Sequence, residues 1–239
     1  MSKAAARHRL SWRLVRHHLG LALTSVVLGA AVYAALPGAP TTVGLSKATA
    51  YVGLALLAAT LLLGPLKVLR KQSGPLSDDL RRDTGIWAAM VGGLHVIVGL
   101  QIHMGSPWLY FFYGADERAR FASLPIRLDL FGLANDTGLI ATLILVLLLC
   151  LSNDLSMRLL GNWWWKRLQQ LNYGLLALVV VHGILYQRIE DREPVWVLVF
   201  WILWLAAVIV QLVGFRIRSA RIAGRGAQLA AGDRVESRT

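Results

Sequence analysis

Two histidines lie inside long apolar stretches of this chain and are its strongest candidates for chemistry. His95 lies in Gly85–Met104 and His182 in Leu168–Gln187, and neither stretch contains an Asp, Glu, Lys or Arg residue. A polar side chain in hydrocarbon costs free energy unless a partner satisfies it, so both are candidate functional residues. Because neutral imidazoles that face each other from two helices can hold a haem iron from both sides, we expect haem ligation. The alternative is a structural hydrogen bond from each ring to another helix.

The spacing of the two histidines predicts that they share one depth in a membrane. His95 lies 13 residues after Arg82, and His182 lies 13 residues after Gln169. Each of these reference positions belongs to or adjoins a basic cluster, and such clusters favour the cytoplasmic membrane surface. Two helices that start at the same surface would bring the two imidazoles to the same level.

Small residues flank His95 on its own helix face. Gly92 and Gly99 lie three residues before it and four residues after it, positions that share a helix face. They would let a flat porphyrin approach the helix, although glycines also allow plain helix packing in membranes. His103 lies about 80° around the helix from His95, so we interpret it as an interfacial residue rather than a second ligand. The remaining histidines fall in the basic N-terminal arm, where solvated or headgroup-facing roles are expected: His8, His17 and His18.

Apolar stretches long enough to cross a membrane make up most of the chain. The 239 residues are 56% hydrophobic, with a mean hydropathy of +0.55, and a helix of about 20 residues crosses the hydrocarbon core. The pattern predicts an all-α membrane protein, with a basic arm over 1–18, one six-helix bundle over 19–215 and a basic, disordered tail over 216–239. The six expected spans are Leu19–Leu36, Ala48–Leu66, Gly85–Met104, Thr137–Ser152, Leu168–Gln187 and Val195–Phe215.

Basic residues are distributed unevenly between the two ends of these spans. Of the 25 Lys and Arg residues, 19 lie in the N-terminal arm, the second and fourth connections and the C-terminal tail. By the positive-inside rule, both termini are therefore expected in the cytoplasm. The net charge of +12 is a topology signal, and without a reader motif it does not indicate nucleic-acid binding.

The single cysteine limits the cofactor chemistry. Cys150 lies inside the fourth expected span, which excludes an intramolecular disulfide, a multi-cysteine metal site and covalent haem attachment. We therefore expect any haem to be bound non-covalently, as haem b.

Three features lie in the connections between the expected spans, and two of them have a functional as well as a structural interpretation. Asp83 or Thr84 is expected to cap the third helix. The triple Trp163-Trp164-Trp165 is typical of an interfacial anchor, or of an aromatic platform beside a flavin or a docked reductase. The external stretch Gly105–Asp136 is either a plain connector or a partly helical lid over a haem edge. Its arginines could pair with haem propionates or with an acidic partner: Arg118, Arg120 and Arg127.

Two segments carry a resemblance to a known family. RRDTGIWAAMVGGLHVIVGL, at 81–100, resembles the third helix of the ferric reductase-like transmembrane family. SNDLSMRLLGNWWWKRLQQLNYGLLALVVVHGILY, at 152–186, resembles the fourth cytoplasmic connection and fifth helix of that family. Within the family, the likeness is greatest to the MsrQ-type haem-binding subunits of the bacterial methionine sulfoxide reductase system. The resemblance covers Arg81 to Tyr186 and implies a multi-pass protein of the bacterial inner membrane that binds haem b through His95 and His182.

One departure from the family bears on the number of haems. The family usually has a histidine 13 residues before the second ligand of the fifth helix, where this chain has Gln169. The corresponding position before His95 is Arg82. Because an amide is a poor ligand for haem iron, we expect one haem per chain, in the outer half of the membrane.

The resemblance implies a haem electron conduit rather than a complete reductase, since the chain has no G-x-G-x-x-G dinucleotide motif after a strand pattern. It implies that electrons come from a cytoplasmic flavin reductase or from a quinol, with FMN or a quinone as further candidate cofactors of the protein. They would pass to a periplasmic oxidoreductase such as a molybdoenzyme. A stand-alone transmembrane ferric or cupric reductase is a second interpretation, and a haem-free scaffold or transporter subunit is a third.

Overall fold

The computed structural model describes residues 3–69, 76–102, 106–114 and 125–236. Within these ranges the chain is helical, apart from loops and one isolated antiparallel bridge between Phe112 and Ile126. The expected all-α class is thereby confirmed. The elements are α1 (Lys3–Ala34), α2 (Thr41–Leu69), α3 (Leu76–Gly99), the 3-10 helix η1 (Pro107–Tyr110), α5 (Leu130–Leu151), α6 (Asp154–Gln169), α7 (Leu171–Ile189) and α8 (Pro194–Glu236).

Five helical segments among the described residues are long and apolar enough to cross a membrane. The expected third span, Gly85–Met104, is not one of them. The helix α3 ends at Gly99 and its first half is charged, so its apolar part is too short to meet the length for a span. A multi-pass membrane protein is thus indicated, while the sixth span and the cytoplasmic termini stay predictions. The five segments are Val15–Ala34, Thr41–Lys67, Leu130–Leu151, Asp154–Ile189 and Pro194–Arg221.

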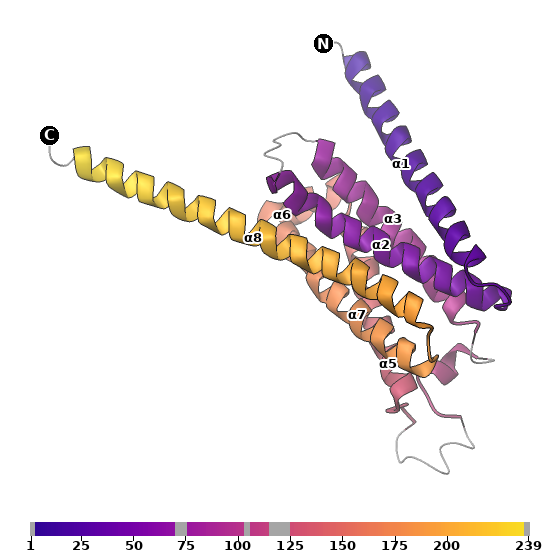
Figure 1. Cartoon of the computed structure of the whole chain (residues 1–239). Helices are drawn as coiled ribbons and strands as arrows, with labels where there is room; N and C mark the ends of the chain where they lie inside the picture. Colours follow the sequence, from indigo (N-terminus) through magenta and orange to yellow (C-terminus); the bar gives the residue numbers. More distant parts are fainter. Residues whose placement is uncertain (1–2, 70–75, 103–105, 115–124, 237–239) are drawn as a thin grey trace.

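α2 lies at the centre of the bundle, in contact with α1, α3 and α8, and α5 packs against α7 (Figure 1). Fully buried core residues come from several of these helices, among them Leu61 of α2, Ala134 of α5 and Leu175 of α7. α2 and α3 approach closely where Gly53 faces Gly92, because a Cβ at Gly53 would lie 3.7 Å from the Gly92 nitrogen. Small residues at such a crossing allow the two backbones to pack against each other.

A proline inside α2 is compensated by a side chain of α8. Pro65 has no N–H, so the carbonyl of Leu61 loses the helical partner it would otherwise have four residues later. Gln211 donates to this carbonyl through Nε2, at 2.6 Å. Gly214 lies against the proline ring, where a Cβ would come within 2.6 Å of Pro65 Cβ. The proline therefore fixes how α2 and α8 pack.

A polar cluster joins α1 to α3, and it corrects one expectation. Asp83 or Thr84 was expected to cap the third helix, but α3 begins at Leu76 and both residues are buried in the helix interior. The Asp83 carboxylate bonds His17 Nδ1 at 2.8 Å, and His18 Nε2 lies 3.9 Å from its other oxygen. Trp87 Nε1 donates to His18 Nδ1 at 3.0 Å. His17 is therefore held in a polar contact between two helices, whereas the His18 side chain stays 40% exposed.

The connection from α5 to α7 is a kinked helix rather than a loop. The Asn153 side chain caps α6 by accepting from the Ser156 N–H, and Arg82 of α3 bonds Asp154 at 2.7 Å. Gly161 has a φ of 71°, a left-handed conformation that favours glycine and kinks α6. The helix is interrupted again at Gln170. α7 therefore begins at Leu171, three residues after the start of the expected span Leu168–Gln187.

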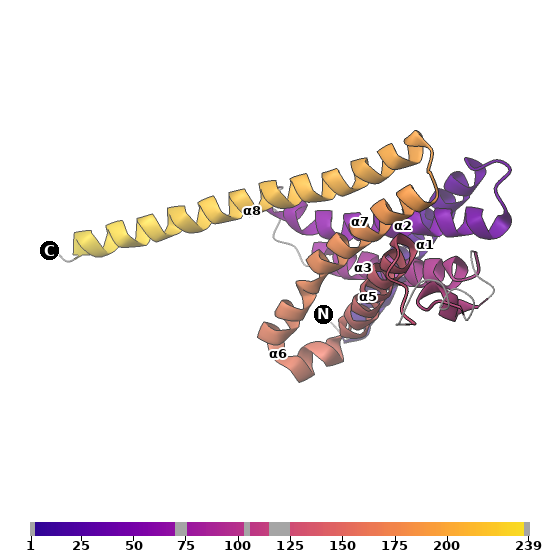
Figure 2. The same ribbon diagram turned by 90° about the horizontal axis from the view of Figure 1, so that it is seen from below.

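α8 is much longer than the expected sixth span. It continues as a helix to Glu236, so the tail expected to be disordered is helical over its described part. Figure 2 shows the C-terminal half of α8 extending well beyond the other helices. The bundle that positions the histidines is therefore formed by α2, α3, α5, α7 and the first half of α8.

Candidate functional site

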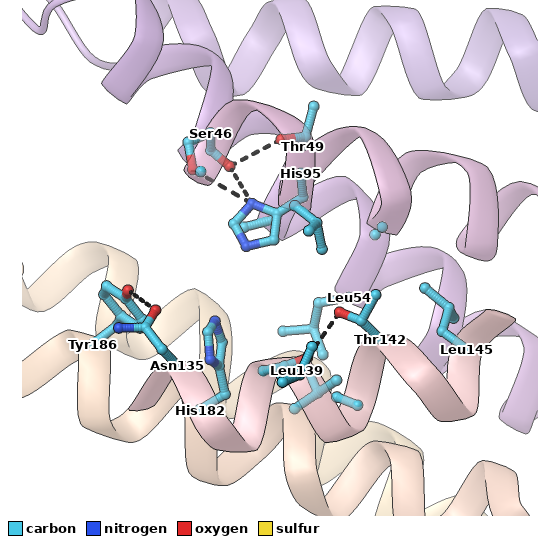
Figure 3. A pocket seen from close by; sticks show the side chains of 18 of the residues that line it. Ser46, Thr49, Leu54, His95, Asn135, Leu139, Thr142, Leu145, His182 and Tyr186 are labelled. Carbon is cyan, nitrogen blue, oxygen red and sulfur yellow. Dashed lines mark hydrogen bonds between the residues drawn. The ribbon is translucent and has the colours of Figure 1, made fainter. Parts of the chain in front are cut away.

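The two histidines of the apolar stretches meet inside the bundle. His95 comes from α3 and His182 from α7, and their ring centroids lie 6.3 Å apart with the ring planes at 81°. Figure 3 shows the rings pointing toward each other across a cavity. The two imidazoles thus lie close together, as helices that start at one membrane surface would place them.

Each imidazole is held by the backbone of a neighbouring helix. His95 Nδ1 lies 3.1 Å from the carbonyl oxygen of Ser46 in α2, and 3.4 Å from the Ser46 hydroxyl. His182 Nδ1 lies 2.8 Å from the carbonyl oxygen of Ala134 in α5. A carbonyl oxygen can only accept, so Nδ1 carries the hydrogen in both rings. In the neutral imidazole, Nε2 then has its lone pair available to a ligand.

This arrangement has the features of a metal-ligating histidine pair. Histidines that bind metals almost always donate their second ring N–H to a carbonyl, a carboxylate or water, which fixes the tautomer and the ring orientation. Metal–nitrogen bonds to histidine are about 2 Å long, so two imidazoles on opposite sides of one metal ion have centroids roughly 6 Å apart. The observed 6.3 Å fits that separation.

The histidines line a cavity of about 290 Å³ between α2, α3, α5 and α7. This volume is near the lower end of the roughly 300–1,000 Å³ of typical cofactor pockets. Its walls change in character from one end to the other. The apolar side chain of Leu145 lies toward one end, and the polar groups of Asn135 and Tyr186 lie at the other (Figure 3).

Glycines keep the cavity open around both rings. Gly99, one of the two expected cofactor-binding glycines, lines it, and a Cβ there would lie 4.0 Å from His95 Cε1. Gly92 also lines it, but a Cβ there would meet Leu145 of α5 at 2.9 Å, so this glycine serves helix packing as well. Gly138 of α5 was not anticipated. A Cβ at this position would lie 2.8 Å from His182 Nδ1.

Tyr186 is a second residue that the sequence reasoning missed. It lines the cavity, its ring centroid lies 4.9 Å from that of His182, and its hydroxyl donates to Asn135 Oδ1 at 2.7 Å. A signal was present, because Tyr186 follows His182 by four residues and so shares its helix face. The Ser46 and Ala134 carbonyls gave no signal, since every residue carries one.

The described part of the stretch Gly105–Asp136, which was expected to be external, packs onto the end of the bundle near the histidines. Its first half contains η1, and its last seven residues form the first two turns of α5. Tyr110 is fully buried, and its hydroxyl donates to the Gly99 carbonyl at 3.0 Å. Tyr110 and Phe111 line the cavity, which agrees with a partly helical cover. Arg118 and Arg120 lie outside the described residues, as does His103.

Arg127 is fixed within this cover. Its guanidinium bonds the Asp129 carboxylate at 3.0 Å and the Leu109 carbonyl at 3.3 Å, and it stacks over the Tyr113 and Phe131 rings. Asp129 in turn caps α5 by accepting from the Gly132 N–H at 2.7 Å. Partial burial works to raise the pKa of Asp129, but the hydrogen bonds from Arg127 and Gly132 outweigh it and hold this pKa below its usual value.

The tryptophan triple lies on α6, away from the cavity lining. Trp163 and Trp164 are exposed, and Arg167 stacks over the Trp163 ring at 4.8 Å. Trp165 instead donates to the Leu151 carbonyl at 2.9 Å. Among the described residues, no group of three or more His, Cys, Asp or Glu side chains is arranged to hold a metal ion.

No protein-family model matches this chain, and no curated protein matches it either.

Proposed function

We propose that this protein is a membrane haem b electron-transfer protein in which His95 and His182 are the two axial ligands of one haem. One observation carries the proposal: two imidazoles from different helices face each other at a centroid distance of 6.3 Å, each with Nδ1 bonded to a backbone carbonyl. That combination leaves both Nε2 atoms available to one iron. A structural role alone would need only the carbonyl bonds, and not a cavity between the rings.

The residues around the histidines are suited to binding a haem. Glycines border both rings, the cavity is apolar at its inner end, and the positions where a second ligand pair would be hold Gln169 and Arg82. Arg82 bonds the start of α6 instead. The proposal is therefore one haem per chain.

The protein supplies binding and orientation, while a bound haem supplies reversible one-electron chemistry at iron. His95 and His182 would hold the iron, and the Ser46 and Ala134 carbonyls hold the two histidines in the tautomer that leaves Nε2 available. We propose that electrons come from a cytoplasmic flavin reductase or a quinol and leave toward a periplasmic oxidoreductase, as the resemblance to ferric reductase-like proteins implies. The site is in the inner membrane in this proposal.

The test is the haem content of purified full-length protein. His95→Ala and His182→Ala should each abolish the reduced-minus-oxidised b-type spectrum, because each removes one axial ligand. His18→Ala is the matched control, since it removes an imidazole that does not line the cavity. A pyridine haemochrome assay on the wild type should give a haem-to-protein ratio near one.

Two results would contradict the proposal. A full haem complement in either His95→Ala or His182→Ala would show that the pair does not ligate the iron. A ratio near two in the wild type would mean that a further histidine has been recruited.

A further inference from the structure

Two charged side chains that line the histidine cavity, Glu190 and Arg192, meet a third, Lys47, beside it. Lys47 Nζ lies 3.6 Å and Arg192 Nε lies 3.1 Å from the same oxygen, Glu190 Oε2. Lys47 comes from the start of α2, and the other two come from the turn between α7 and α8. All three side chains are largely buried, with 23%, 12% and 17% of the Lys47, Arg192 and Glu190 side chains exposed. Glu190 and Arg192 line the cavity itself.

This group has one more positive than negative charge. Two cations share a single carboxylate oxygen, and partial burial weakens the screening that water would give to the remaining charge. A guanidinium has five N–H donors, and the contact with Glu190 uses the one on Nε. The two cations can therefore bind a carboxylate of a ligand in competition with Glu190.

The cavity walls set the direction in which an amphiphilic ligand would lie. Leu145 lies toward one end, and Tyr186 and Asn135 lie at the other (Figure 3). Glu190 follows Tyr186 by one helical turn at the end of α7, and both Glu190 and Arg192 line the cavity. A flat apolar molecule with acid groups along one edge would place that edge against the charged end. The acid edge and the apolar body of the ligand would therefore fix its orientation relative to the two imidazoles.

We propose that Arg192 and Lys47 form an anion subsite that binds a carboxylate of the cavity ligand, and that Glu190 is the internal counter-ion this carboxylate displaces. The proposal rests on the proposed function, in which the carboxylates are the propionates of haem. It assigns this role to the α7–α8 turn instead of the external arginines. Of those, Arg127 already bonds Asp129 and the Leu109 carbonyl.

The experiment compares two ligands that differ only in their acid groups. Full-length protein produced under haem limitation is titrated in detergent with haem and with haem dimethyl ester, whose propionates carry no charge. The Soret absorption reports binding of each. Wild-type protein should bind haem roughly tenfold more tightly than the ester, the difference expected for a charge-assisted hydrogen bond. Arg192→Gln should remove this preference by weakening haem binding alone.

Three further variants make the test specific. Arg192→Lys should keep part of the preference, because it retains the charge but loses the planar fork of donors. Glu190→Gln should increase the preference for haem over the ester, since it removes the competing carboxylate. Arg188→Gln is the matched control, because Arg188 is an exposed cation near the same helix end and its loss should leave the preference unchanged.

Ester binding shows whether each variant keeps an intact cavity. Unchanged ester binding together with lost preference in Arg192→Gln supports the subsite. Equal binding of haem and ester by the wild type would overturn the subsite and leave histidine ligation standing. Binding of neither ligand by the wild type would overturn the proposed function, and the subsite with it. A preference that survives in both Arg192→Gln and Lys47→Gln would assign the propionate contact to other residues.

Discussion

The lack of a side chain at position 138 lets the His182 ring lie against the backbone of α5. The ring bonds the Ala134 carbonyl one turn away from Gly138, and a Cβ at Gly138 would come within 2.8 Å of Nδ1 and 2.9 Å of Cε1. Real Cβ atoms essentially never approach this closely. The glycine thus sets both the position of the ring and the tautomer that its hydrogen bond selects.

Gly138→Ala should therefore lower haem affinity without removing a ligand. The added methyl group pushes the His182 ring away from α5 and weakens its bond to the Ala134 carbonyl. Loss of such an orienting contact typically costs about 10–100-fold in metal affinity. Haem titration of the purified variant measures this. Gly93→Ala is the control, because a Cβ there meets nothing within 4 Å, and equal affinities of the two variants would refute the role of Gly138.

Asp129 gives the outer end of α5 a dependence on acid pH. Hydrogen bonds from Arg127 and Gly132 lower the pKa of Asp129 against the opposing effect of burial. A group whose pKa is lower in the folded state stabilises it fully above the unfolded pKa of about 4. This stabilisation is lost as pH falls from about 4 through the lowered folded pKa.

Thermal unfolding in detergent should show this loss between pH 5 and 2 in the wild type, values chosen to bracket a normal aspartate pKa of about 4. Asp129→Asn should unfold at a lower temperature near pH 7 and should approach the wild type at the acid end. Asparagine is itself a good N-cap residue, so this variant keeps the capping hydrogen bond and removes only the charge. A constant difference between the two proteins across the whole pH range would contradict the assignment.

The two ligand candidates were predictable from the sequence, while their partners were not. An imidazole within a long uncharged stretch is conspicuous, and the shared offset of 13 residues gave the common depth of His95 and His182. The groups that hold them are carbonyls of Ser46 and Ala134, 49 and 48 residues away along the chain. No residue type marks such an acceptor, because its position depends on how α2 and α5 pack. Gly138 was hidden for the same reason.

At the scale of helices, the contact between α1 and α3 depends on a small polar cluster. α1 lies at the edge of the bundle and leaves many apolar side chains exposed, as expected for a helix that faces lipid. Its polar link to α3 runs through Asp83, which is 4% exposed and bonds His17. A buried carboxylate without its partner is costly, so the two residues should be energetically coupled.

A double-mutant cycle of His17→Ala and Asp83→Ala should give a coupling energy of at least about 1 kcal/mol, as for a hydrogen bond to a charged group. The free energy of unfolding would be measured by denaturant titration in mixed micelles. Asp83→Ala with Ser25→Ala is the control cycle, because the Ser25 hydroxyl bonds only its own helix, at the Leu21 carbonyl. A coupling for His17 no larger than that for Ser25 would argue against this link.

Helix types were easier to predict than helix ends. Long apolar stretches located α2, α5, α7 and α8, but charged residues concealed the first two turns of α3, so Asp83 was read as a cap. The extension of α3 back to Leu76 brings Asp83 to α1, a contact that depends on tertiary packing over 66 residues. The kink at Gly161 was also missed, since a single glycine in a polar connection has many conformations.

At the scale of the whole molecule, the histidine pair lies near one end of the bundle. His95 is four residues from the end of α3, and Ser46, which holds it, is five residues from the start of α2. At 1.5 Å per residue, these offsets correspond to roughly 6–8 Å along the helix axes. The opposite end of α3 is 19 residues from His95, or about 28 Å. The charge bias of the connections predicts that the nearer end is external.

Electrons should therefore leave a bound haem more readily toward the external side. The protein would be reconstituted with haem in sealed vesicles, its orientation determined by protease cleavage of the C-terminal part of α8, and the haem reduced. A membrane-impermeant one-electron oxidant is then added to the external or the cytoplasmic face, and reoxidation is followed from the b-type absorption. Oxidant on the external face should act faster, because the path through protein is shorter there. Arg127→Ala would remove the bonds to the Leu109 carbonyl and the Asp129 carboxylate that hold the cover and should speed only the external reaction. Reoxidation from the cytoplasmic face alone would reverse the proposed direction of electron flow.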